Sequence, residues 1–201
     1  MLKMRISINL EGLKFAVVGA TGLVGRAVVR ELTQAGAQVL AIARHRPTVP
    51  MHPNVRFVAM DVRSQPLTNV VHDVDGLVYA VDDDHDVINA NLTTAIKVVK
   101  TAAEHMPWGG TVVVLSSLAG FVRDPADVEY TAAKAGVAAA VPGLAREFAD
   151  RDVRIVALSP GVLNHHSAVI VARFAALLLS GELPFSGVEL PLITPCSHFE
   201  N

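Results

Sequence analysis

Short apolar runs rich in β-branched residues alternate with helical patterns along almost the whole chain. The runs predict strands at 14–19, 38–43, 55–60, 76–81, 111–116, 153–158 and, with a weaker pattern, 187–192. Helical periodicity predicts helices at 23–35, 85–106, 128–149 and 166–180, with a short helical piece at 66–72. Because strands and helices alternate, we expect right-handed crossovers and a parallel sheet with helices on both faces. The runs are continuously apolar, as strands covered on both faces require.

The composition fits one domain of this kind. The chain has 201 residues, of which 51% are hydrophobic and 18% charged, enough to bury a single core. We expect one domain over 1–201, with an N-terminal extension at 1–12 and a tail at 193–201. A net charge of −2 gives no electrostatic basis for binding nucleic acid. The most apolar long stretch, 130–149, is interrupted by Lys134 and Pro142, so we predict no membrane span.

The cysteine content and the first residues of the chain indicate the cellular compartment. Cys196 is the single cysteine and cannot form an internal disulfide, and residues 1–14 lack the continuous apolar run of a signal peptide. We therefore expect a cytoplasmic protein.

The acidic run DDDHD at 82–86 precedes a predicted helix, where carboxylates accept hydrogen bonds from backbone N–H groups. We interpret it as capping, and we predict no metal site because the histidines and Cys196 show no ligand spacing.

The first predicted strand runs directly into GATGLVG at 19–25. Gly19, Gly22 and Gly25 lie where a strand turns into a helix, which is the context of the glycine-rich dinucleotide motif. Glycines there permit a tight turn and leave backbone N–H groups free to bind a pyrophosphate. The alternative is a tight strand-to-helix turn with no ligand. Besides the glycines, the candidate cofactor contacts of this turn are Thr21, Leu23 and Val24.

The second predicted strand ends in AIARHR, with Arg44 and Arg46 and no carboxylate. An acidic residue there would bind the ribose 2′-hydroxyl of NAD, whereas an arginine accommodates a 2′-phosphate. Arg44 therefore favours NADP(H) over NAD(H), unless both arginines are ordinary solvated charges. Asp61, after the third strand, could accept from the adenine amino group with Val62 beside the ring. The alternative for Asp61 is a turn-capping aspartate.

Polar residues also follow the fifth predicted strand. Ser116 and Ser117 stand at its carboxyl end, on the side where open α/β sheets bind ligands. Tyr130 comes thirteen residues after Ser117, and Lys134 comes four residues later, on the same face of a predicted helix. Such a tyrosine–lysine spacing alone is more often a solvated surface pair than a catalytic one.

Taken together, the motifs resemble the short-chain dehydrogenase/reductase family. The pieces are GATGLVG at 19–25, MDV at 60–62, NANL at 89–92, LSSLAG at 115–120, YTAAK at 130–134 and RIVALSPG at 154–161. They occur in the family's order and span nearly the full length. The resemblance implies a Rossmann-like, doubly wound sheet with strand order 3-2-1-4-5-6-7.

The resemblance also implies roles for particular residues. Tyr130 would be the general acid or base, and Ser117 would hold the substrate oxygen. Lys134 would bind the nicotinamide ribose and, with the oxidised ring, lower the pKa of Tyr130. Asn91 would hold a water of the proton relay, although a polar position inside a helix is the alternative. The remaining implied cofactor contacts, with Tyr130 and Lys134, are Ala80, Pro160 and Gly161.

Two departures from the family pattern stand out. The usual NNAG after the fourth strand is YAVD here, residues 79–82. After SPGVLN the chain passes almost at once into the last predicted helix, where longer members insert the segment that covers the substrate. The protein thus resembles a short member with a reduced substrate loop and an open pocket. His165 and His166 adjoin this mouth, and at most one of them is expected to face it.

The leading functional hypothesis is an NADP(H)-dependent oxidoreductase that interconverts a carbonyl and a secondary alcohol of a small molecule. A non-redox cyclase, dehydratase or isomerase that uses the same tyrosine is the second hypothesis, and a nucleotide-sensing binding protein is the third. The family resemblance implies a homodimer or homotetramer that packs through the helices at 85–106 and 128–149. The substrate is not indicated by the sequence, because substrate choice in the family lies largely in the missing segments.

Overall fold

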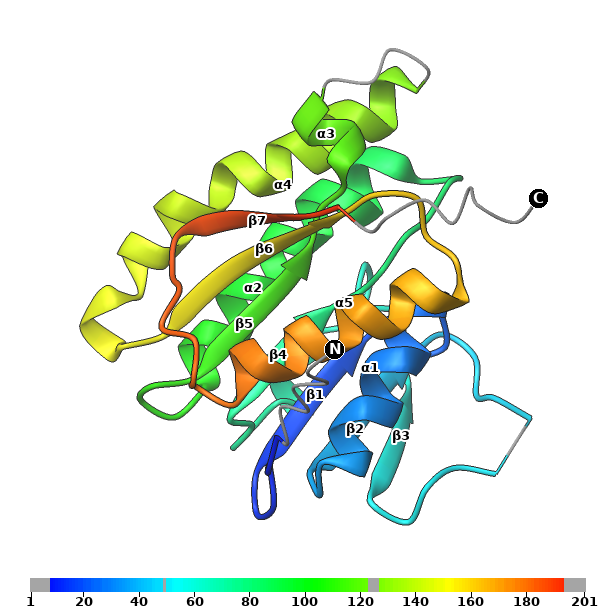
Figure 1. The fold of residues 1–201 in the computed structure, drawn as a ribbon, viewed down its shortest axis with the longest axis vertical. Helices are drawn as coiled ribbons and strands as arrows, with labels where there is room; N and C mark the ends of the chain where they lie inside the picture. The colour runs from blue at the N-terminus through cyan, green and yellow to red at the C-terminus, as the bar shows by residue number, and fades with distance from the viewer. Residues whose placement is uncertain (1–7, 49, 123–126, 194–201) are drawn as a thin grey trace, which may run out of the picture.

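A seven-stranded parallel sheet forms the middle of the protein, as Figure 1 shows. The computed structural model describes residues 8–48, 50–122 and 127–193. The strands are β1 Lys14–Val18, β2 Gln38–Ala43, β3 Val55–Ala59, β4 Gly76–Tyr79, β5 Thr111–Leu115, β6 Arg154–Pro160 and β7 Val188–Leu192. Their order is β3-β2-β1-β4-β5-β6-β7, which confirms the predicted doubly wound topology, including the weakest predicted strand, β7.

Helices cover both faces of this sheet. They are α1 Leu23–Gln34, η1 Leu67–Asn69, the π-helical turn η2 Asn89–Thr93, α2 Thr94–His105, α3 Leu118–Val122, α4 Val128–Glu147, η3 Ala149–Arg151 and α5 His165–Leu179. Helices α1 and α5 pack on one face and α2 and α4 on the other (Figure 1). Side chains alternate along the strands between two buried clusters, one under each pair of helices. This double covering explains the continuously apolar strands.

Three details differ from the sequence prediction. The helix expected at 85–106 contains the π turn η2 before α2 begins, and the short helix α3 was not expected. Leu10, in the predicted extension 1–12, is fully buried, and its backbone N–H bonds to Ala35 O at 2.8 Å. This part of the extension therefore belongs to the core. The predicted tail, apart from residue 193, lies outside the described residues.

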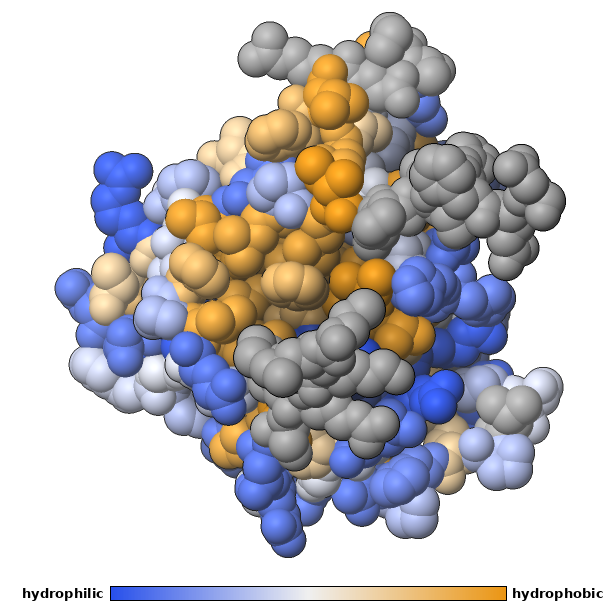
Figure 2. Space-filling model, viewed as in Figure 1, coloured by the Kyte–Doolittle hydropathy of each residue, from blue (hydrophilic) through white to orange (hydrophobic). Residues whose placement is uncertain are grey.

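Apolar side chains gather on the face that Figure 2 presents, between α5 and β7. Partly buried residues of this region that pack against the core are Leu163, Leu183, Val188 and Leu190. The surface lies beside the short connection from β6 to α5. The first residue of α5, His165, is only five positions after Pro160, the last residue of β6. This connection is as short as the sequence predicted.

Candidate active site

The glycine turn between β1 and α1 brings three backbone segments into close contact. Gly19 has φ +83°, and a Cβ atom there would lie 2.5 Å from the carbonyl oxygen of Ala80. A Cβ atom on Gly25 would lie 2.1 Å from Gly19 O. Neither position can carry a side chain without displacing backbone. Gly22, the N-cap of α1, has no side-chain capping bond, so the first N–H groups of α1 are left for another acceptor.

Two adjoining hollows open at the carboxyl ends of the strands. The first measures about 210 Å³ and the second about 170 Å³. They share Gly22, Ala80, Val81 and Asp82 and therefore form one cleft with two halves. The predicted cofactor residues that line the first half are Gly19, Thr21, Gly22, Arg44, Asp61, Val62 and Ala80. Those that line the second half are Gly22, Leu23, Val24, Ala80, Tyr130, Lys134 and Pro160.

Predicted residues outside these two linings lie next to them. Gly161 follows Pro160 at the end of β6, and its N–H bonds to Leu192 O at 3.3 Å. Gly25 lies on the other side of the turn, against Gly19. Ser117 follows β5 and its hydroxyl accepts from Ala119 N at 3.2 Å, at the start of α3.

The second half of the cleft holds the tyrosine and lysine side by side. Asp127 caps α4 by accepting from Tyr130 N at 2.9 Å, and Lys134 follows one turn later. The Lys134 ammonium lies over the Tyr130 ring, 5.3 Å from its centroid. Ser116 Oγ donates to Lys134 O at 2.8 Å and so joins the end of β5 to α4. The Tyr130 hydroxyl interacts with the side chains of Ser117 and Asp82.

The protein environment favours the uncharged forms of both groups. Burial raises the pKa of Tyr130 to about 12, the charge of Asp82 adds to the shift, and hydrogen bonding to Ser117 opposes it. Burial also lowers the pKa of Lys134, against the opposing effect of Asp82. The sequence led us to expect a lowered pKa at Tyr130. The groups of the protein itself shift that pKa the other way, because desolvation disfavours the phenolate.

Asn91 lies in the π turn η2 and is 1% exposed. Its Nδ2 donates to Asp83 O at 2.8 Å and to Val87 O at 3.0 Å. Its Oδ1 has no hydrogen-bond partner among the described residues. These two hydrogen bonds join the segment after β4 to the start of the following helix, and the Oδ1 atom remains as a buried acceptor without a partner among the described residues.

The first half of the cleft is crossed by ion pairs that the sequence did not predict. Arg44 Nη1 lies 3.2 Å from Asp83 Oδ2, and Arg63 Nη2 lies 2.8 Å from Asp61 Oδ2. Arg63 also reaches Asp86 Oδ2 at 3.3 Å. Arg44 and Asp61, the two polar residues assigned to the adenosine end, are therefore already paired within the protein. Arg63 could have been suspected from its position two residues after Asp61, within reach of an Asx-type turn.

Asp83 anchors this network. It is 8% exposed, and its Oδ1 accepts from the backbone N–H groups of His85 at 3.0 Å and Asp86 at 3.1 Å. Burial raises its pKa, but these bonds and the charges of Arg44 and Arg63 outweigh burial and leave the pKa below its usual value. Asp83 thus holds backbone N–H groups of the segment ahead of the helix, while η2 itself has no side-chain capping bond, so capping of the helix by the acidic run stays a prediction. Among the described residues, no group of three or more His, Cys, Asp or Glu side chains is placed to hold a metal ion.

The first two residues of α5 are the histidines His165 and His166. Asn164 caps α5 in a capping box with Ser167. His165 lines a hollow with Arg26 and Arg30 of α1, and His166 is exposed. Neither histidine lines the half of the cleft that holds Tyr130. Their predicted place at the substrate mouth is not supported.

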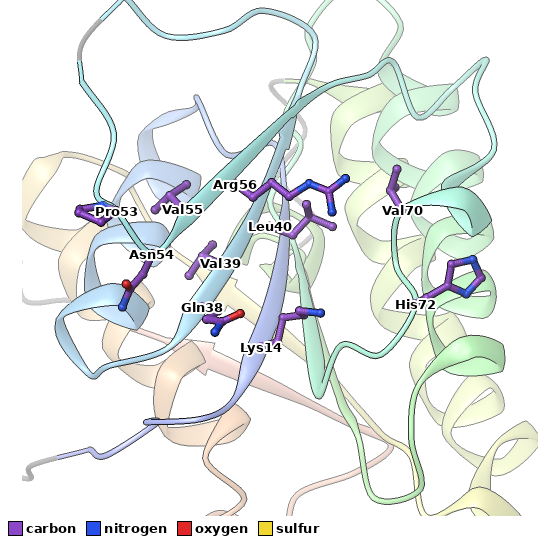
Figure 3. Close-up of a pocket in the computed structure, with 10 residues that line it drawn as sticks. All are labelled: Lys14, Gln38, Val39, Leu40, Pro53, Asn54, Val55, Arg56, Val70 and His72. Carbon is purple, nitrogen blue, oxygen red and sulfur yellow. The ribbon is translucent and has the colours of Figure 1, made fainter.

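A further cavity of about 580 Å³ lies at the opposite edge of the sheet, at the amino ends of β1, β2 and β3. Figure 3 shows Lys14 and Arg56 pointing from the sheet toward the segment that carries Val70 and His72. None of the predicted site residues lines this cavity. The candidate active site is therefore the smaller cleft, where the glycine turn meets Tyr130.

Sequence comparison identifies the proteins that the chain is similar to. The profile described as short chain dehydrogenase matches residues 77–171, which contain Asn91, Ser117, Tyr130 and Lys134. The chain is also 28% identical over 185 residues to the 3-oxoacyl-[acyl-carrier-protein] reductase FabG of Vibrio harveyi, covering 78% of this chain and 76% of that protein. Over this region the chain is similar to the short-chain dehydrogenase/reductase family.

Further comparisons give proteins of the same family. FabG of Aquifex aeolicus is 24% identical, with 84% of this chain and 81% of that protein covered. A short-chain dehydrogenase/reductase from Mycobacterium ulcerans superposes with a TM-score of 0.81 at 18% identity, over 92% of this chain and 90% of its own. One from Leptospira borgpetersenii, solved with bound NAD+, gives 0.76 at 18% identity, over 95% of both chains. These likenesses support the doubly wound fold. Within the described part of the chain, no helix is both long and apolar enough to cross a membrane.

Proposed function

We propose that this protein is an NADP(H)-dependent oxidoreductase that interconverts a carbonyl and a secondary alcohol of a small molecule. The observation that carries the proposal is the meeting of Tyr130 and Lys134 with the glycine turn along one cleft. Gly19 and Gly25 fit a dinucleotide, because side chains at both positions would collide with backbone of the turn. The nicotinamide, when bound, supplies the hydride chemistry.

Side chains in and beside the second half of the cleft carry the remaining proposed roles. Ser117 is the proposed hydrogen-bond donor to the carbonyl oxygen, and Tyr130 gives that oxygen its proton during reduction. A pKa of about 12 keeps the Tyr130 hydroxyl protonated at neutral pH, ready to act as an acid. The Lys134 ammonium, close to the Tyr130 ring, stabilises negative charge on the tyrosine once the proton has left. Asn91 stays in the proposal as the holder of a relay water through its unpartnered Oδ1.

The preference for NADP(H) rests on Arg44. Its side chain is 53% exposed at the rim of the first half of the cleft, where a 2′-phosphate would lie. The pairing with Asp83 does not remove Arg44 from this role, because one guanidinium can donate to two carboxylate or phosphate groups. In this proposal Asp61 and Val62 flank the adenine, with Arg63 holding the Asp61 carboxylate in place.

Two experiments, first cofactor binding and then turnover, test the proposal. Nicotinamide fluorescence would first be titrated with NADPH and NADH, and we expect tighter binding of NADPH. NADPH absorbance would then be followed with a panel of ketones and a 3-oxoacyl thioester, the substrate type named for the FabG relatives. Consumption of NADPH with stoichiometric alcohol supports the proposal. Product formation without a change in nicotinamide absorbance would instead support the non-redox hypothesis, and binding without any turnover would support a sensor.

Assembly and location remain predictions. Helices α2 and α4 pack on one face of the sheet, and they are the helices through which we propose a homodimer or homotetramer. Sedimentation at micromolar concentration would test this assembly. A cytoplasmic location is likewise retained as a proposal, which fractionation of the source cells would check.

A further inference from the structure

Asp82 lies where the two halves of the cleft meet and has no counterpart in the family pattern quoted above. It follows β4 and occupies the last position of YAVD, where the usual NNAG has glycine. Its Oδ1 lies 3.4 Å from Lys134 Nζ. The Asp82 side chain is 55% exposed, whereas the Lys134 side chain is 3% exposed. A carboxylate at the solvent edge therefore faces an ammonium group buried behind it.

A buried ammonium group loses its hydration and needs a partner to remain charged. Asp82 is the ion-pair partner that the described residues supply to Lys134. The other groups around Lys134 are Tyr130 on its own helix and Ser116 at the end of β5, which bonds to the Lys134 backbone oxygen rather than to the ammonium. The other carboxylate near Tyr130 is Asp127, which accepts from a backbone N–H at the start of α4.

We propose that Asp82 is a positioning residue of this active site, which holds the Lys134 side chain as a charged ammonium group beside Tyr130. Burial alone favours the neutral amine, and the carboxylate opposes that tendency. An ammonium that stays charged near the tyrosine stabilises the phenolate formed during proton transfer. The proposal rests on the proposed function for its catalytic consequence, although the ion pair itself can be tested without turnover.

The direct test is a titration of the lysine side chains by NMR in the cofactor-free protein, labelled with 13C at lysine Cε. Asp82→Asn keeps the size of the side chain and removes its charge. We expect Lys134 to lose its proton at a pH at least about one unit lower in Asp82→Asn than in the wild type. Lys134→Arg assigns the resonance. An unchanged Lys134 titration in a folded Asp82→Asn protein would overturn the proposal.

Matched variants distinguish the specific position of Asp82 from the general loss of one negative charge. Asp84→Asn removes a carboxylate of the same acidic run whose side chain is 93% exposed, and we expect it to leave Lys134 unchanged. Asp82→Glu should keep the Lys134 titration closer to the wild type than Asp82→Asn does. If Asp82→Asn fails to fold, Asp82→Gly, which places the usual family residue there, takes its place with the same expected downward shift. An equal shift in Asp84→Asn and Asp82→Asn would also overturn the proposal.

The pH dependence of turnover gives the second readout. Reduction requires protonated Tyr130 and charged Lys134, and Lys134 loses its proton first because its pKa is lowered while that of Tyr130 is about 12. The alkaline limb of NADPH-dependent reduction should therefore move to lower pH in Asp82→Asn. Loss of the Asp82 charge lowers the pKa of Tyr130 as well as that of Lys134, and the NMR titration of Lys134 tells the two contributions apart. An alkaline limb that keeps its position would overturn the catalytic consequence. A shifted Lys134 titration in a protein that reduces no carbonyl would leave the role of Asp82 standing and reject the proposed function instead.

Discussion

The two halves of the cleft are built in different ways. Around Tyr130, the buried groups Lys134 and Ser116 belong to α4 and the end of β5, and one carboxylate absent from the family motif, Asp82, lies at the solvent edge. Around Arg44 and Asp83 the polar groups form a partly exposed network of ion pairs that the family motif does not contain. The Tyr130 half thus keeps the family's serine, tyrosine and lysine beside one replaced position, whereas the Arg44 half is held together by charge pairs of its own. Four variants test this contrast.

Tyr130→Phe should give the largest effect. We expect kcat for carbonyl reduction to fall by about 1,000-fold, because the proton donor is lost, while NADPH binding is nearly unchanged. Tyr79→Phe is the matched control, since the Tyr79 hydroxyl donates to Ala90 O at 2.6 Å outside the reaction and its loss costs about 1 kcal/mol of stability. Steady-state kinetics would measure both. A Tyr130→Phe enzyme that keeps most of its rate would show that the second half of the cleft is not the proton-transfer site.

Gly25→Ala tests the turn that joins the two halves. The new methyl group would meet Gly19 O at 2.1 Å, so α1 must move away from β1. We expect a loss of about 3 kcal/mol in the free energy of unfolding and weaker NADPH binding. Gly143→Ala in α4 has open space around it and should stabilise by about 0.5–1 kcal/mol. Urea denaturation compares the two, and equal stabilities would contradict the close packing at Gly25.

Asp83→Asn tests whether the ion network also supports the fold. The folded pKa of Asp83 lies below its usual 3.8, so its stabilising contribution is present above that pH and is lost as pH falls through the folded value. We expect the variant to be about 2 kcal/mol less stable at neutral pH, with the difference shrinking below about pH 4. Denaturation at both pH values measures this, with the exposed Asp84→Asn as control. A constant difference at all pH values would argue against an electrostatic origin.

Arg44→Ala should give the smallest and most selective effect. Loss of one contact to a 2′-phosphate should weaken NADPH binding by about tenfold and leave NADH binding unchanged. Arg46→Ala, whose guanidinium lies 6.0 Å from the Phe57 ring centroid, is the control. Fluorescence titration of both cofactors measures the ratio. If NADPH and NADH weaken equally in Arg44→Ala, the preference for NADP(H) does not come from this residue.

Several parts of the site could be predicted from the sequence because their signals are local. The Tyr130 and Lys134 pair is fixed by helical spacing, and the glycine turn by its place between β1 and α1. The partners of Arg44 and Lys134 could not be predicted in the same way. Asp83 and Asp82 lie some 40 to 50 positions from them along the chain, and no periodicity specifies which carboxylate a cation meets. The direction of the Tyr130 pKa shift was missed for a related reason, since burial is a property of the packed fold.

The sequence by itself determined the alternation of strands and helices, and hence the parallel sheet, because apolar periodicity depends only on residues that are close together along the chain. It also determined which end of the sheet carries the chemistry, because the motifs follow the strands at their carboxyl ends. The tertiary structure alone decided the π turn at Asn91, the ion pairs that cross the first half of the cleft and the approach of Asp82 to Lys134. These depend on which distant segments meet once the sheet has formed, because the interaction of two charges falls with the distance between them.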